Sequence, residues 1–141
     1  MQDPYRTLRQ RLYEVLDAAL KVEIYRDGIP RLGAKIPSVS ITYVGGSGAS
    51  LGMGRWIAAG TQGEALTMRV QLDLFHSSQA DLDDLADKVY DALFDAYAQL
   101  SAASVLAYRV VLSADMPPEE QLSRGEYRKI IDYEFLVEYS E

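Results

Sequence analysis

Residues 66–93 read LTMRVQLDLFHSSQADLDDLADKVYDAL, and this stretch holds the two patterns that decide the fold. From Leu66 to Phe75 apolar and polar residues alternate, which is the period of a strand that buries one face. Ser78 then precedes apolar residues that recur every three or four positions, so the pattern predicts a capped amphipathic helix to about Leu100. A strand that is followed at once by a long helix indicates a helix packed across a sheet.

The residues before this stretch predict one helix and two strands. A helix over residues 4–20 is expected, since Pro4 stands at the first helical position, where its missing N–H is harmless. A short strand is expected over residues 22–25. Residues 36–44 alternate apolar side chains with Ser and Thr, which predicts a strand with one face in water. Paired with the strand 66–75, it would form a hairpin.

The residues after the opening stretch predict two further strands, over 105–113 and 127–139, joined by the polar connection 114–126. The order of elements is therefore α-β-β-β-α-β-β. Two helices among antiparallel strands predict a single α+β domain over residues 1–141. We expect a two-layer sandwich, in which a mainly antiparallel sheet carries one long helix packed across it and an N-terminal helix.

The composition fits one globular domain and excludes several kinds of chemistry. A chain of 141 residues can bury a core without disulfides or a structural metal. No cysteine is present, which excludes disulfides, thiolate metal sites and cysteine nucleophiles. The net charge is −7, and an acidic surface disfavours binding to nucleic-acid phosphates. The sequence has no signal-peptide pattern and no apolar run of membrane-spanning length, so we expect a soluble protein made in the cytoplasm.

A glycine-rich segment, GGSGASLGMGRWIAAGTQG at residues 45–63, is the most unusual part of the chain. It fails both phosphate-binding patterns, because no lysine follows its glycines as in a P-loop and the glycine spacing differs from the dinucleotide fingerprint. We expect a long hairpin tip whose apolar residues need a partner surface, with Trp56 folded back onto its own domain as the alternative. The candidate contacts in this tip and in the connection 114–126 are Leu51, Met53, Arg55, Trp56, Ile57, Met116 and Pro117.

No catalytic or metal-binding constellation is recognisable, so we expect no enzyme, no cofactor and no metal. His76 is the only histidine, and no serine stands in a nucleophile-elbow motif. The spacing of the acidic residues that open the second helix fits a helix start matched to its dipole rather than a cation site. These residues are Asp81, Asp83, Asp84 and Asp87. An enzyme whose site is completed between subunits stays open as an alternative, and it would need convergence of Arg55, Glu64, Arg69 and His76.

The order of elements and several stretches resemble one family of viral proteins. The chain opens with PYRTLRQRLYEVLDAAL, followed by KVEIYRD and IPSVSITYVGG. Its middle runs from LTMRVQLDLFHSS into ADLDDLADKVYDAL, and it closes with YRKIIDYEFLVEY. Together these stretches resemble the tail-completion or tail-terminator proteins of long-tailed bacteriophages and prophages. The resemblance extends over nearly the whole chain and is architectural, since these families have no signature motif.

The resemblance implies a structural subunit of the phage head–tail junction. Copies of the chain would form a ring, commonly a hexamer, that caps the finished tail tube and binds the head connector. The segments 45–63 and 114–126 would contact neighbouring rings, and DNA would pass through the lumen without specific binding. The protein would be part of the virion tail or neck, assembled in the host cytoplasm. Related tail-tube or neck subunits share this architecture, and a non-enzymatic α+β module that binds a ligand or peptide remains an alternative.

Overall fold

The structure is a computed structural model that describes residues 4–30, 35–50, 56–58, 61–117 and 126–140. The expected α+β class and the order of the elements are confirmed, with two short elements added. In chain order the elements are α1 (Pro4–Ala19), β1 (Glu23–Tyr25), β2 (Ser38–Ser50), β3 (Trp56–Ala58), β4 (Thr61–His76), α2 (Gln79–Phe94), α3 (Tyr97–Ser101), β5 (Val105–Asp115) and β6 (Tyr127–Ser140).

The strands form one sheet in the order β1-β2-β4-β6-β5, with β3 paired to β4 outside this path. β1 runs parallel to β2, and the other pairs that the structure describes are antiparallel. Ile41 of β2 lies opposite Leu72 of β4, which lies opposite Ile131 of β6, so the predicted hairpin of β2 and β4 is confirmed. The central strands β4 and β6 therefore separate two edges, one formed by β1 and β2 and the other by β5.

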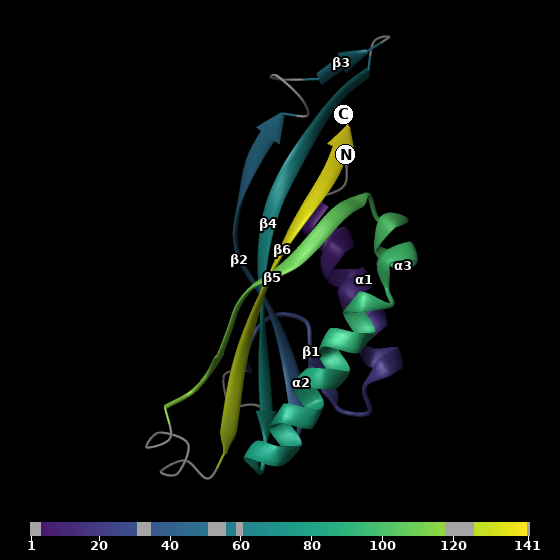
Figure 1. Cartoon of the computed structure of the whole chain (residues 1–141). Coiled ribbons are helices and arrows are strands. Elements are labelled where there is room, and N and C mark those ends of the chain that lie inside the picture. Colours follow the sequence, from purple (N-terminus) through teal and green to yellow (C-terminus); the bar gives the residue numbers. More distant parts are fainter. Residues whose placement is uncertain (1–3, 31–34, 51–55, 59–60, 118–125, 141) are drawn as a thin grey trace.

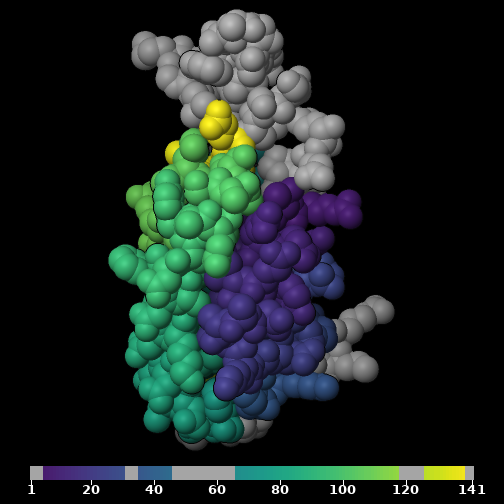
Figure 2. All heavy atoms as spheres, turned by 90° about the vertical axis from the view of Figure 1, so that its right-hand side faces the viewer, coloured from purple at the N-terminus to yellow at the C-terminus, as the bar shows by residue number. Residues whose placement is uncertain are grey.

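The three helices cover one face of the sheet (Figure 1). α1 and α2 lie side by side in this layer, as the view of the helix face in Figure 2 shows. The layer forms because the apolar stripe of each helix meets the apolar face of the alternating strands, and removal of this area from water stabilises the fold. Large fully buried side chains come from both layers and include Leu8, Leu12, Leu16, Ile41, Leu72, Leu74, Leu82, Leu93, Leu100, Ile131 and Phe135.

The second helix differs from the prediction, because the single helix expected over residues 78–100 is divided. α2 begins after the N-cap Ser78, whose side chain accepts a hydrogen bond of 3.2 Å from a backbone N–H of the first turn, as expected. It ends at Phe94, and the short helix α3 starts at Tyr97. The apolar spacing continues across this break to the buried Leu100, so periodicity alone could not reveal it.

In the glycine-rich segment, the described residues 45–50, 56–58 and 61–63 lie in strands rather than in the expected long loop. β2 continues through the first glycines to Ser50, β4 already begins at Thr61, and β3 pairs with the start of β4. Glycine weakens a strand, but backbone hydrogen bonds to a long partner strand still extend the ladder. β5 likewise continues to Asp115, which shortens the expected connection 114–126.

Candidate assembly surface

The residues that the sequence predicts to contact partners lie at opposite ends of the sheet. β3, which carries Trp56 and Ile57, pairs with the start of β4, and the sheet extends there past the helix layer (Figure 1). Met116 is half-buried and Pro117 is exposed at the other end, where the Met116 N–H donates to the Arg128 carbonyl. One copy of the chain therefore does not bring the two sets together. Three further predicted contacts lie outside the described residues: Leu51, Met53 and Arg55.

Exposed apolar side chains mark both edges of the sheet, a feature absent from the sequence prediction. Phe94 is 83% exposed at the end of α2, and the Tyr97 hydroxyl of α3 donates to the Leu106 carbonyl of β5 (3.4 Å). The Gly28 N–H donates to the Ile41 carbonyl and brings the turn after β1 against the other edge. Among residues whose exposure the structure describes, the large exposed apolar ones are Phe94, Tyr97, Leu106, Val110 and Leu112 at the β5 edge, and Ile29, Ile36, Tyr43 and Val44 at the β1–β2 edge. Single exposed apolar residues are ordinary, but their grouping at two edges is typical of contact surfaces.

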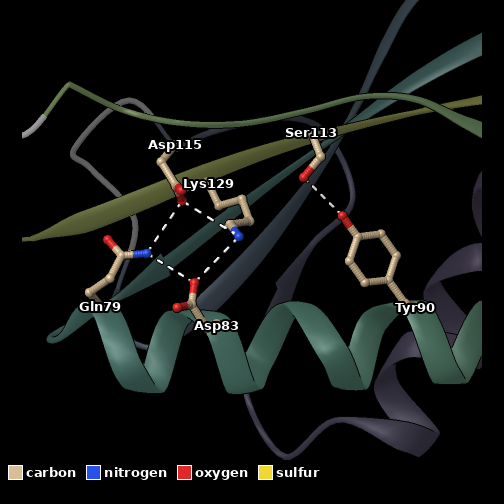
Figure 3. Close-up of polar contacts among 6 residues, drawn as sticks. All are labelled: Gln79, Asp83, Tyr90, Ser113, Asp115 and Lys129. Carbon is tan, nitrogen blue, oxygen red and sulfur yellow. Dashed lines mark hydrogen bonds and ion pairs between the residues drawn. The ribbon is translucent and has the colours of Figure 1, made fainter.

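Polar contacts hold α2 against β5 and β6 and so position the β5 edge (Figure 3). The Lys129 ammonium lies 3.4 Å from Asp83 Oδ1 and 3.6 Å from Asp115 Oδ1. A glutamine in the first turn of α2 donates to the same two carboxylates. Further along the helix, the side-chain oxygens of Tyr90 and Ser113 are 2.9 Å apart. The acidic start of α2 therefore also anchors the helix to the sheet.

The sheet face opposite the helices carries buried polar groups. Asp73 on β4 is 1% exposed and accepts a hydrogen bond of 2.6 Å from the Arg128 guanidinium. Ser38 and Ser40 on β2 are fully buried, although the strand pattern predicts that this face lies in water. That prediction is wrong for these two positions, which lie opposite Phe75 and Asp73 of the neighbouring strand, and both of those residues are buried too.

Asp132 on β6 shares this polar face and is 7% exposed. Its Oδ1 has no hydrogen-bond partner among the described residues. Burial raises the pKa of the Asp132 carboxyl; Arg69 offsets this in part, and Asp73 raises the pKa further. Asp132 therefore binds a proton more readily in the folded state than in the unfolded chain. The stability of the domain falls as the pH rises from the pKa of Asp132 in the unfolded chain through its raised pKa in the folded state.

Replacing Asp132 with asparagine is expected to stabilise the domain by about 1 kcal/mol at neutral pH, because an amide carries no charge to bury. The gain should disappear at low pH, where the native carboxyl is protonated in both states. Thermal unfolding of both proteins at about pH 7 and about pH 3 measures the difference. Glu134→Gln on the same strand is the control, since Glu134 pairs with Arg109. An Asp132→Asn protein that melts no higher than wild type at neutral pH would contradict the prediction.

Of the residues named for a composite catalytic site, Arg55 lies outside the described residues, and Arg69 and His76 do not converge within one chain. Arg69 and His76 are seven positions apart on β4, so their side chains lie on opposite faces of the sheet. The His76 ring accepts a hydrogen bond of 2.9 Å from the Ser77 N–H and lies 3.9 Å from the Asp81 carboxylate. The described residues contain no group of three side chains placed to hold a metal ion. Among the described helices, none has both the length and the apolar character needed to cross a membrane.

No family model matches the chain, and no curated protein matches its sequence. Among solved structures, the chain is similar to the PVC sheath/tube terminator of an extracellular contractile injection system in the extended state, with a TM-score of 0.60 and 18% identity over 100% of this chain. The chain spans 57% of the length of that terminator. A chain in the virion of a native gene transfer agent particle matches at a TM-score of 0.42 and 14% identity, with 96% of this chain and 92% of that chain covered. This chain therefore shares the fold of the matched part of a sheath/tube terminator.

Proposed function

We propose that the chain is a structural subunit that ends the tail of a phage-like particle. Copies of it form a ring, a hexamer, that closes the tail tube and joins it to the head connector. The observation that carries this proposal is the fold shared with a sheath/tube terminator over the full length of this chain. Because one fold can serve several functions, the surface of the molecule also has to support the role.

The surface supports a protein that acts through contacts with other subunits. Large apolar side chains are exposed at both edges of the sheet, where they remain in water unless another molecule covers them. The paired strands β2 and β4 also extend beyond the helix layer (Figure 1). A projecting hairpin can reach a neighbouring ring without disturbing the packed layers, because the described core lies between the sheet and the helices.

The proposed partners are further copies of the chain, the tail-tube protein and the head-connector protein. The hairpin that carries β3 would contact one neighbouring ring, and the segment at Met116 and Pro117 would contact the other. DNA would pass through the ring without specific binding, since 21 acidic residues against 14 basic ones disfavour adhesion to phosphates. The proposed location is the virion tail or neck, after assembly in the host cytoplasm.

Trimming the hairpin tests this proposal. Ser50 and Glu64 lie opposite each other in the β2–β4 ladder, so residues 51–63 can be replaced by the two-residue turn Asn-Gly. The trimmed protein should keep its melting temperature within a few degrees, because the described core lies outside the removed segment. It should no longer cap tubes assembled from the tail-tube protein of the same particle, as scored by electron microscopy.

The control for this experiment is Asp17→Arg, which changes an exposed residue of α1 and leaves the hairpin intact. It should cap tube ends as the native protein does. Native protein that leaves the tube ends open would overturn the proposed function. A trimmed protein that caps as well as the native one would exclude the hairpin as the contact.

A further inference from the structure

Acidic residues accompany the exposed apolar residues at the end of α2. Asp87, Asp91 and Phe94 follow one another at positions i, i+4 and i+7, so they share one face of the helix. All three are exposed. Within the part of the chain that the structure describes, neither aspartate has an ion-pair partner. We call these three residues the acidic stripe.

Arginines gather at the opposite edge of the sheet. Arg6 and Arg9 of α1 and Arg26 after β1 line a surface hollow of about 410 Å³, together with Gln10 and Asp27. Arg9 binds Asp27 at 2.7 Å, and one aspartate against three arginines leaves the hollow positive. We call it the arginine hollow. It is a local positive surface on a chain of net charge −7.

The stripe and the hollow cannot meet within one copy of the chain. α1 faces α2 and α3 across a groove of about 510 Å³, which Arg11 and Ala18 line on one side and Asp95 and Gln99 on the other. The arginine hollow uses the other side of α1, where Arg26 belongs to the β1 edge. Figure 2 shows α1 and α2 in contact along their inner sides. Only a second molecule can therefore bring the acidic stripe to the arginine hollow.

We propose that the acidic stripe of one copy binds the arginine hollow of the next copy. Guanidinium groups bind carboxylates with paired hydrogen bonds and also stack on aromatic rings, so the hollow can receive both Asp91 and Phe94. The exposed apolar residues at the two edges become buried around this contact. Because the two surfaces differ, the contact is head-to-tail, and a head-to-tail contact either closes into a ring or continues as a filament. The inference rests on the proposed function, since it identifies the contact that closes the proposed ring.

Charge reversal tests the contact on the full chain. Asp87→Arg with Asp91→Arg, or Arg6→Glu with Arg26→Glu, should each weaken self-association by about tenfold or more, measured by sedimentation velocity at low salt. Phe94→Ala should weaken it as well, because an exposed aromatic side chain that becomes buried on association is a common energetic centre of an interface. Asp17→Arg is the matched control and should associate as the native chain does, since Asp17 is an exposed α1 residue outside the hollow.

Mixing the two double variants gives the decisive result. The variant with the reversed stripe keeps a native hollow, and the variant with the reversed hollow keeps a native stripe. An equimolar mixture should therefore recover the association that each lacks alone. Circular dichroism of each variant shows that it is folded. Association of either double variant at native strength, or no recovery in the mixture of folded variants, would overturn the inference. A native chain that stays monomeric up to about 1 mM would do the same.

The capping assay on tail tubes separates this inference from the proposed function. If the double variants cap tube ends as well as the native chain, the function stands and the proposed contact is wrong. If the mixture recovers association but native rings leave tube ends open, the contact stands and the proposed function is wrong.

Discussion

Replacing Phe135 with alanine is expected to lower the free energy of unfolding by about 3–5 kcal/mol. Phe135 is 1% exposed on the central strand β6, and its ring centroid lies 5.6 Å from that of Tyr108 and 5.9 Å from that of Tyr133. Loss of the ring removes buried apolar area and leaves a cavity between the sheet and the helices, which tight packing prevents from closing. Urea unfolding measures the change as a lower midpoint at an unchanged slope.

The neighbouring residue provides the control for this prediction. Leu136 follows Phe135 on β6, points to the opposite face of the sheet and is only half-buried. Leu136→Ala should therefore cost about 1 kcal/mol, because less apolar area returns to water and no enclosed cavity forms. If both alanine variants lose the same stability, Phe135 is not the centre of the core between the two layers.

The parts of the fold that periodicity determines could be predicted from the sequence. The alternation from Leu66 to Phe75 and the apolar stripe after Ser78 define β4 and α2, because each pattern reports which side chains the second layer covers. The strand through Gly45 to Ser50 could not be predicted in this way, since glycines carry no such pattern. These residues are extended because they pair with β4, and a pairing between distant segments leaves no periodic pattern in the sequence.

The candidate assembly surface also has one part that the sequence predicts and one part that only the structure reveals. Phe94 is a large aromatic residue on the polar side of a predicted helix, on the same helical face as Asp87 and Asp91. The sequence pattern therefore indicates this half of the proposed contact. The arginine hollow had none, because Arg6 and Arg26 lie on different elements and meet only through the fold. Patterns along a chain reveal faces of single elements, whereas surfaces built from several elements need the structure.

Asp73 is a buried residue whose role only the structure reveals. The alternation of β4 places it on the polar face, yet it is 1% exposed. Arg128 donates to its Oδ1 from Nη2 at 2.6 Å and from Nε at 3.0 Å, and Gln71 donates to its Oδ2 at 3.0 Å. The Arg128 guanidinium also lies 5.6 Å from the centre of the Phe75 ring. A carboxylate so deeply buried depends on this charged partner.

Replacing Arg128 with methionine is therefore expected to destabilise the domain by about 3–5 kcal/mol, because the Asp73 charge stays buried without its counter-charge. Arg109→Met is the matched control, since Arg109 pairs with Glu134 at 3.3 Å on the exposed surface and should contribute only about 0–1 kcal/mol. Adding Asp73→Asn to Arg128→Met should recover part of the lost stability, because a neutral amide needs no counter-charge.

Urea unfolding of the native protein, the two single variants and the double variant measures these differences. Equal losses for Arg128→Met and Arg109→Met, or a double variant less stable than Arg128→Met alone, would show that the buried charge does not set the cost.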